Sequence, residues 1–452
     1  MKKIGSILKN KDIMSRILFT VLILFVFRIG ALITVPGVDT SKITEAVTTN
    51  SALSLMNLLG GGTLQTFSIF ALGVSPYITA QIIIQLLSAD VLPALSDLRR
   101  QGQHGRKKME MANRYLTLML GAVQAYGIIK TIENSTEVSL IKSAPGYEWL
   151  QYLYIIIVML AGAMIVMWLG DQISIKGIGN GISMIIFAGI VSSLPSQVGN
   201  AFTLWVVDSM GVSDSAQIAG TFQFILYILS FLLIVAFVAF IELSKRKIPV
   251  QHSGKGGGQT PSMARASFLP IKINPAGVIP VIFASSIMMA PSVVNAFLGG
   301  DSDANWLNIF NSSSMTNMGN GFSMPWGLLI YIVLTIAFTY FYANVQINPQ
   351  QMAENFQKNG SYIPGIRPGL ETERYVRKVL NRVTFIGAIA LSAIAALPAI
   401  LSLTIFKDYP SLALGGTGLI IVVGVALELN SQIDGLLAGK SFDEVVASGG
   451  RL

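Results

Sequence analysis

The chain has 452 residues, of which 52% are hydrophobic and only 12% are charged, and its formal net charge is +8. Soluble domains carry about 25% charged residues, so this composition excludes an ordinary soluble protein. Cysteine is absent, and both histidines, His104 and His252, lie in polar segments. These counts argue against disulfides and against thiolate or histidine metal sites, and we expect neither a metal nor a cofactor.

The N-terminus resembles the start of a signal peptide. Five basic residues, the last of them Arg16, precede or open an apolar run over residues 17–35. That run is too long for a signal-peptide core, and no small-residue cleavage site follows it. We therefore expect it to be a retained first membrane span.

Apolar segments of membrane-spanning length recur along the chain. A helix needs about 20 mainly apolar residues to cross ~30 Å of hydrocarbon. By this criterion the sequence predicts an all-α polytopic membrane protein with ten spans, at about 17–35, 69–89, 113–132, 149–169, 178–195, 220–242, 275–298, 325–347, 380–404 and 413–433.

The distribution of basic residues predicts the orientation. With the N-terminus in the cytoplasm, 26 of the 31 lysines and arginines fall in cytoplasmic segments or near the cytoplasmic ends of spans. Cytoplasmic loops are enriched in lysine and arginine. We expect both termini to be cytoplasmic and the membrane to be the plasma membrane of a bacterium.

Ten spans divide into two halves of five. An odd number of spans per half reverses the orientation of the second half, which predicts an inverted repeat. The expected halves are residues 1–195 and 220–452, joined by an external hinge loop over 196–219.

The stretch that follows the first span is interrupted. A short apolar piece precedes Gly60-Gly61-Gly62, and Pro76 falls in the next apolar run. Broken apolar segments occur where the backbone lines a cavity, because lipid cannot satisfy free N–H and C=O groups. A surface half-helix is the alternative, but we expect residues 53–66 to form a re-entrant element.

Several sequence features resemble nucleotide-binding or proton-relay motifs but lack the residues that these sites require. Residues 177–181 (GIGNG) resemble a dinucleotide loop without its glycine spacing, and 439–441 (GKS) lacks the first glycine of a phosphate loop. Charges within spans are few, chiefly Arg28 and Glu428. Proton relays need more buried ionisable groups, so we expect these two to snorkel or to pair.

Two predicted spans carry glutamines. Gln85 and Gln124 are costly in lipid. They would form an interhelical hydrogen bond in a generic bundle, or close a seam in a bundle that opens sideways.

Two large loops on the predicted cytoplasmic side carry basic groups. Lys245-Arg246-Lys247 opens the first, and Arg367 lies in the proline- and glycine-rich turn 364–369 of the second. Ordinary positive-inside charge explains scattered lysines. A constrained turn that presents Arg367 favours docking of an acidic partner.

Five blocks of the sequence resemble the SecY family and occur in the family's order. They lie at 67–87 (FSIFALGVSPYITAQIIIQLL), 177–195 (GIGNGISMIIFAGIVSSLP), 274–287 (NPAGVIPVIFASSI), 362–369 (YIPGIRPG) and 415–423 (GGTGLIIVV). The loop 251–267 departs from the family, because it is richer in glycine and poorer in basic residues.

The resemblance implies an hourglass channel with a lateral gate between spans two and three on one side and seven and eight on the other. It implies a narrow aliphatic ring of Val74, Ile78, Ile186, Ile282 and Ile421. It implies an external plug that includes Leu55, Met56, Asn57, Leu58, Leu59, Gly60, Gly61, Gly62 and Leu64. The gate lining would include Thr79, Gln85, Gln124 and Ser286.

The resemblance also implies partners. The ribosome or the motor SecA would dock on Lys245, Arg246, Lys247, Arg265 and Arg367. The small membrane subunits SecE and SecG would brace the bundle, and signal peptides, unfolded preproteins and membrane lipid would be its substrates and surroundings.

Two functions remain to be compared. A passive polypeptide channel needs no nucleotide site of its own and no catalysis, because a partner supplies the energy. A secondary transporter also uses inverted repeats and broken helices, but it needs polar or ionisable groups at mid-membrane. The corresponding positions here are isoleucines, which favours a seal and hence the channel.

Overall fold

The structure of the chain is a computed structural model. It describes residues 10–38, 43, 47, 53, 57, 60–88, 92–136, 147–208, 214–252, 267–297, 306–310, 316–317, 323–404 and 416–447.

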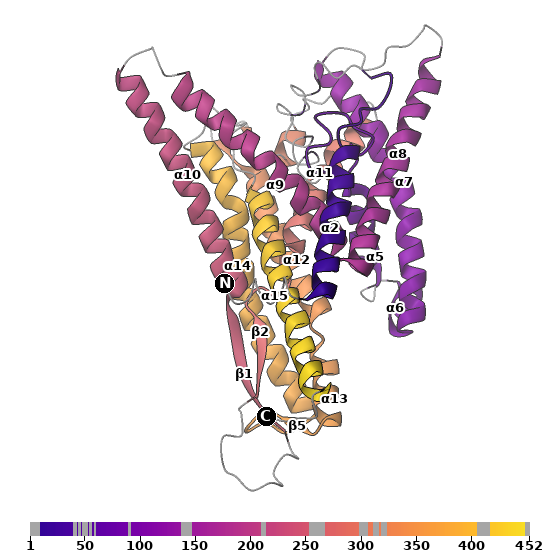
Figure 1. Ribbon diagram of the computed structural model, residues 1–452, viewed down its shortest axis with the longest axis vertical. Helices are drawn as coiled ribbons and strands as arrows, with labels where there is room; N and C mark the ends of the chain where they lie inside the picture. The colour runs from indigo at the N-terminus through magenta and orange to yellow at the C-terminus, as the bar shows by residue number, and fades with distance from the viewer. Residues whose placement is uncertain are drawn as a thin grey trace.

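The first half of the chain consists of helices that run between the two ends of the molecule (Figure 1). Its elements are α2 (Lys11–Gly30), α5 (Ser75–Ser88), the short α6 (Pro93–Arg100), α7 (Gln103–Thr136), α8 (Glu148–Lys176) and α9 (Gly181–Phe202). A π-helical turn, η1 (Thr203–Val207), continues α9.

The second half of the chain is also mainly helical. Its helices are α10 (Asp214–Leu243), α11 (Ile279–Phe297), α12 (Trp326–Gln346), α13 (Pro349–Lys358), α14 (Leu370–Thr404) and α15 (Gly416–Ala447). Its short elements are β1 (Lys245–His252), β2 (Ser267–Lys272), β5 (Ser361–Tyr362), the 3-10 turn η2 (Leu307–Phe310) and the pair β3 (Thr316–Asn317) and β4 (Ser323–Met324).

The predicted helical membrane architecture is confirmed. Eight helices among the described residues are long and apolar enough to cross a membrane. The predicted second and seventh spans correspond to the shorter α5, with 14 residues, and α11, with 19. Large apolar side chains such as Leu18, Phe25 and Phe222 are exposed on the helical body, as expected for a lipid-facing surface.

The connection between the halves differs from the expected loop over 196–219. Helix α9 continues through Pro195 to Phe202 and passes into η1, while α10 begins at Asp214. A proline within a membrane helix is tolerated when neighbours and local π adjustments satisfy the freed backbone groups. Trp205 and Val206 of η1 are buried, so packing holds this turn in place.

A β-hairpin that the sequence reading did not predict follows α10. Strand β1 pairs antiparallel with β2, from Lys245 opposite Lys272 to Val250 opposite Ser267, and its end pairs with β5. Alternation explains the strand, because Ile248 and Val250 are buried while the residues between and before them are exposed. The same period-two signal is present in the sequence, but it is too short to stand out beside the long apolar helices.

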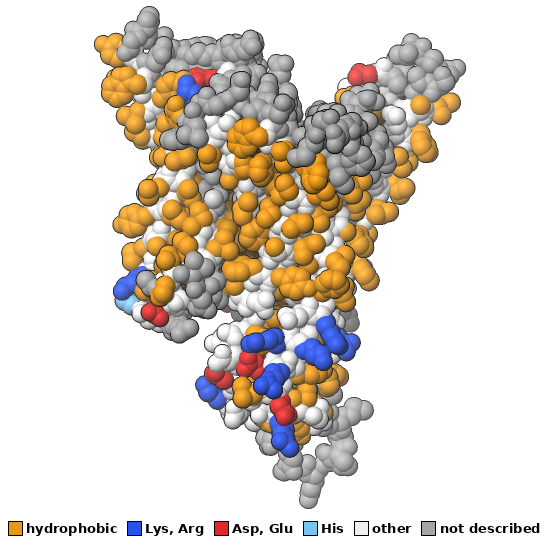
Figure 2. All heavy atoms as spheres, turned by 180° about the vertical axis from the view of Figure 1, so that it is seen from behind, with side chains coloured by type: hydrophobic (Ala, Val, Ile, Leu, Met, Phe, Trp, Pro, Cys, Tyr) orange, Lys and Arg blue, Asp and Glu red, His pale blue; other side chains and the backbone are white. Residues whose placement is uncertain are grey.

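Charged side chains gather at the end of the molecule that carries β1, β2, β5 and α13, which we call the basic end (Figure 2). Orange apolar side chains cover the helical body above it (Figure 2). A small core that includes Ile248, Ile271, Ile363, Val376 and Leu380 fixes the hairpin and the turn before α14 onto the helices.

Candidate functional site

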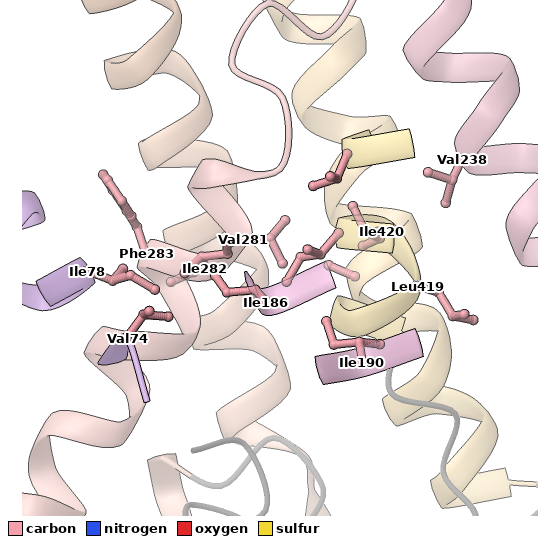
Figure 3. Packing of buried hydrophobic residues seen from close by; sticks show 14 of the residues in the cluster. Val74, Ile78, Ile186, Ile190, Val238, Val281, Ile282, Phe283, Leu419 and Ile420 are labelled. Carbon is pink, nitrogen blue, oxygen red and sulfur yellow. The ribbon is translucent and has the colours of Figure 1, made fainter. Parts of the chain in front are cut away.

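The centre of the molecule is a buried apolar cluster shared by both halves. Val74, Ile78, Ile186, Ile282 and Ile421 all belong to it, and even Ile282, the most accessible of the five, is only 9% exposed. Figure 3 shows Ile78, Ile282 and Ile186 next to one another, with Val74 beside them. The structure therefore places the five positions of the expected ring in one buried apolar cluster.

Four helices supply this ring. Val74 lies one turn before Ile78 of α5, and the Ile78 N–H donates to the Val74 carbonyl at 3.0 Å. Ile186 lies on α9, Ile282 on α11 and Ile421 on α15. The sequence reading did not select other members of the cluster, including Ile190, Val281, Phe283, Leu419 and Ile420. Nothing distinguishes these from ordinary apolar helix residues without the fold.

An irregular segment, residues 60–73, lies between α2 and α5 and packs against the N-terminal half. The side-chain oxygen of Asn57 accepts hydrogen bonds from the backbone of Leu64 and Gln65, at 3.1 and 3.2 Å. The Thr63 hydroxyl contacts the carbonyls of Gly60 and Phe70, at 3.0 and 2.8 Å. These local bonds satisfy backbone groups that a broken helix leaves free.

Arg28 and a pair of glycines fasten the same segment to its neighbours. The Arg28 guanidinium donates to the Gly61 carbonyl at 3.0 Å. Gly61 has φ +75°, and a Cβ placed on it would lie 2.7 Å from the Cα of Gly189 on α9. Only glycine fits this position, because other residues avoid this backbone conformation and the Cβ would collide with backbone.

Part of the expected plug falls on this segment. Gly60, Gly61, Gly62 and Leu64 are described, as is Asn57, and Leu64 is buried in a second apolar cluster with residues of α7 and α8 such as Ile129 and Met159. Leu55, Met56, Leu58 and Leu59 lie outside the described residues.

The expected gate residues lie on α5, α7 and α11, three helices that pack against one another. The Thr79 hydroxyl donates to Ser75 of its own helix, and the Ser286 hydroxyl to Ile282 of its own helix. The side-chain oxygens of Gln85 and Gln124 are buried without a hydrogen-bond partner. The interhelical hydrogen bond that was the alternative reading of the two glutamines is therefore not formed through these oxygens.

The expected docking residues lie at the basic end. Lys245, Arg246 and Lys247 on β1 are exposed, whereas Arg265 lies outside the described residues. Arg367 is exposed on a turn whose backbone is fixed, because the buried Thr372 hydroxyl donates to the Arg367 carbonyl at 2.9 Å. Gly365 and Gly369 flank it with φ of +81° and +104°.

Within the described part of the chain, no group of three or more histidine, cysteine or acidic side chains could hold a metal ion. The structure thus combines a buried apolar cluster shared by both halves, an irregular segment packed beside it, contacts of α11 with α5 and α7, and a basic face.

Curated relatives match the chain almost from end to end. A protein translocase subunit SecY of Streptococcus gordonii is 43% identical over 435 residues, which is 96% of each chain. Its namesake in Bacillus subtilis strain 168 is 42% identical over 443 residues, which is 98% of each chain.

Solved structures share the fold at low sequence identity. A protein-conducting channel has a TM-score of 0.67 at 18% identity, covering 94% of this chain and 92% of its own. Sec61 from a canine ribosome–channel complex of the endoplasmic reticulum has a TM-score of 0.63 at 18% identity, with the same coverage.

The SecY family model matches residues 68–430, a range that includes all five ring positions and all four gate positions. Since this match spans most of the sequence and the two curated relatives align over 96% and 98% of their lengths, the chain belongs to the SecY family.

Proposed function

We propose that this chain is the pore subunit of a bacterial protein translocase, through which unfolded polypeptides cross the membrane and from which hydrophobic segments pass sideways into lipid. The observation that carries the proposal is that both halves contribute to one buried apolar cluster, which contains the proposed ring positions Val74, Ile78, Ile186, Ile282 and Ile421. Aliphatic side chains at a constriction exclude water and ions by dewetting.

The same side chains suit a substrate of varied sequence. They offer a passing polypeptide no hydrogen bonds, so it can slide through without being held. β-Branched isoleucine is stiff at its first side-chain torsion, so widening the ring requires helices to move. A transporter of small solutes would need polar or ionisable groups at mid-membrane. The proposed ring positions are aliphatic, which favours a channel.

The segment 60–73 with Asn57 would act as the plug of this channel. It packs beside the central cluster through Gly61 and Gly189, while Arg28 and local hydrogen bonds hold it. One solved channel of the same fold, at 17% identity and a TM-score of 0.66, is described as having a plug domain that stabilises the closed state and maintains a membrane seal. The gate would be the contact of α11 with α5 and α7.

Partners would supply the driving force and the support. The ribosome or the motor SecA would dock on the basic end, where Lys245, Arg246, Lys247 and Arg367 are exposed. The small subunits SecE and SecG would cover part of the exposed apolar surface. Both termini would face the cytoplasm, as the charge distribution predicts.

Replacing Ile78, Ile186 and Ile282 together by serine tests the ring. The triple variant should conduct ions at rest in planar bilayers and should accept poorly hydrophobic signal sequences. Replacing three apolar residues outside the cluster, Leu18, Phe25 and Phe222, by alanine provides the control. If the triple variant assembles, stays as ion-tight as the parent and discriminates signals equally well, the seal lies elsewhere.

A further inference from the structure

Helix α11 carries Ile282 of the proposed ring close to its start, directly after a turn formed by residues 273–278, which we call the α11 turn. The N–H groups of Val281 and Ile282 both donate to the Val278 carbonyl, at 3.2 and 3.4 Å. The last residue of the α11 turn is therefore bonded to the first turn of the helix. A shift of the α11 turn would carry Ile282 with it.

Two glycines of neighbouring helices let the α11 turn approach them closely. A Cβ on Gly387 of α14 would collide with the carbonyl oxygen of Ile273. A Cβ on Gly424 of α15 would lie 2.9 Å from Cγ1 of Val278. Gly424 follows Ile421 of the ring by three residues and so lies on the same face of α15. The α11 turn thus meets α15 on the face that carries this ring position.

A buried amide holds the α11 turn in this place. Asn274 is 1% exposed, and its Nδ2 donates to Oε1 of Glu242, near the end of α10, at 2.7 Å. The same nitrogen donates to the carbonyl oxygen of Gly277 at 2.8 Å. Both neighbours are acceptors, so the amide must present its nitrogen to them. One side chain therefore closes the turn on itself and ties it to α10.

A backbone hydrogen bond makes a second link between α10 and the α11 turn. The N–H of Ile273 donates to the carbonyl of Ser244 at 3.0 Å. This bond continues the pairing of β1 with β2 by one step beyond Lys245 and Lys272, so it belongs to the hairpin. It holds the first residue of the turn only. The bond from Asn274 to Glu242 acts beyond the hairpin, next to the residues that lead into α11.

We propose that Asn274 is a positioning residue of the channel, which through Glu242 holds the start of α11 so that Ile282 lies among the other ring positions. This inference deepens the proposed channel function and rests on it. The hairpin keeps its own hydrogen bonds without the Asn274 side chain. Loss of the bond to Glu242 therefore lets Ile282 move out of the cluster without unfolding α10 or the hairpin.

Two neutral substitutions of Glu242 isolate the hydrogen bond. Glu242→Gln keeps an acceptor oxygen for Asn274, whereas Glu242→Met has similar length but no comparable acceptor. Lys272 and Glu428 also act on the Glu242 carboxylate through their charges. Both variants remove that charge, so these interactions cancel in the comparison. Glu242 is half-buried, so both variants should assemble, which size-exclusion chromatography checks.

Single cysteines report where the change occurs, because the chain has none of its own. One replaces Ile282. The other replaces Ile234, which is buried in the same cluster but lies on α10, the helix of Glu242. The rate of reaction with a water-soluble thiol reagent is measured on the full-length protein in lipid nanodiscs. Resting ion conductance of the cysteine-free variants is recorded in planar bilayers.

The expected difference lies at α11 alone. The cysteine at Ile282 should react roughly tenfold faster in Glu242→Met than in Glu242→Gln, as expected when a buried donor loses its acceptor. The cysteine at Ile234 should react at the same rate in both variants. Resting conductance should be higher in Glu242→Met.

The outcomes separate positioning from a general loosening of the fold. Equal rates at Ile282 in the two Glu242 variants overturn the proposal. Faster reaction at both Ile282 and Ile234 in Glu242→Met also overturns it, because the bond then stabilises α10 and does not specifically place α11. If the rate rises at Ile282 alone and conductance does not change, Asn274 places Ile282 as proposed. That last result contradicts the seal, and with it the proposed function.

Discussion

The guanidinium of Arg28 and the carbonyl oxygen of Gly61 are joined by a hydrogen bond of 3.0 Å, 33 residues apart in sequence. A charged side chain within an apolar helix is costly unless it finds a polar partner. Here the partner is a backbone carbonyl of the segment 60–73. The sequence reading expected Arg28 to snorkel or to pair, and the structure shows that it pairs with the backbone of the candidate plug.

Removing this bond should loosen the segment. We expect Arg28→Leu to raise resting ion conductance, because a hydrogen bond from a charged donor contributes about 1.5–3 kcal/mol, equivalent to roughly a 10–100-fold change in a closed-to-displaced equilibrium. Single-channel recording in planar bilayers measures it. Arg28→Lys keeps a charged donor and should leak less than Arg28→Leu. Equal conductance in the two variants would show that the bond does not hold the segment.

The close contact between Gly61 and Gly189 should be disrupted by one added methyl group. Gly189→Ala places a Cβ against the backbone of Gly61, where neither side can yield as a flexible side chain would. We expect the segment to be displaced and more accessible to proteolysis, or to labelling of a single cysteine introduced into it. Gly199→Ala on the same helix is the control, because a Cβ there meets nothing within 4 Å. If the segment is equally accessible in Gly189→Ala and Gly199→Ala, the contact between Gly61 and Gly189 does not hold it in place.

Charge reversal at the basic end should weaken partner docking without unfolding the bundle. Arg367 is exposed, and the turn that carries it is held through its backbone, so Arg367→Glu alters the surface alone. Preprotein export in cells that contain only this variant should fall, while its thermal stability stays close to the parent value. Arg367→Lys retains the positive charge and should retain most export. Normal export by the Arg367→Glu variant would show that Arg367 does not contribute to partner docking.

Impermeant thiol reagents can test the predicted orientation in this cysteine-free chain. Cysteines replacing Gln101 and Lys247, both exposed, should not react from outside the cell. Cysteines replacing Tyr147 and Trp306, 64% and 47% exposed, should react. The reverse pattern would invert the topology, and reaction at all four positions would indicate leakage through the membrane.

The sequence predicted the helices better than the contacts that fasten them. Long apolar runs define membrane helices by composition alone, and the five ring positions followed from ordered family blocks. The π turn after Pro195 was missed, because proline normally signals a helix end and only the packing of Trp205 and Val206 keeps this chain helical.

Contacts between distant backbone groups were beyond prediction from the sequence. Gly61 and Gly189 are separated by more than a hundred residues, and neither shows from its own neighbours that the other approaches it. The bond from Gly179 to Gln432 is similar, since 253 residues separate the two and its donor is a backbone N–H present at almost every position. Such pairs are defined by the paths of the helices.

Helix α5 has 14 residues and is therefore about 21 Å long, since each residue adds 1.5 Å. The hydrocarbon core of a bilayer is ~30 Å thick, so this helix is too short to match it. None of the side chains of Ser75–Ser88 is exposed, so its packed neighbours, chiefly α7, shield it from lipid in this state. If its contact with α11 parts, lipids that reach it must compress their tails, at a cost of fractions of a kcal/mol for each ångström of difference. Acyl-chain length thereby becomes a variable in how readily the seam between α11 and its two neighbours parts.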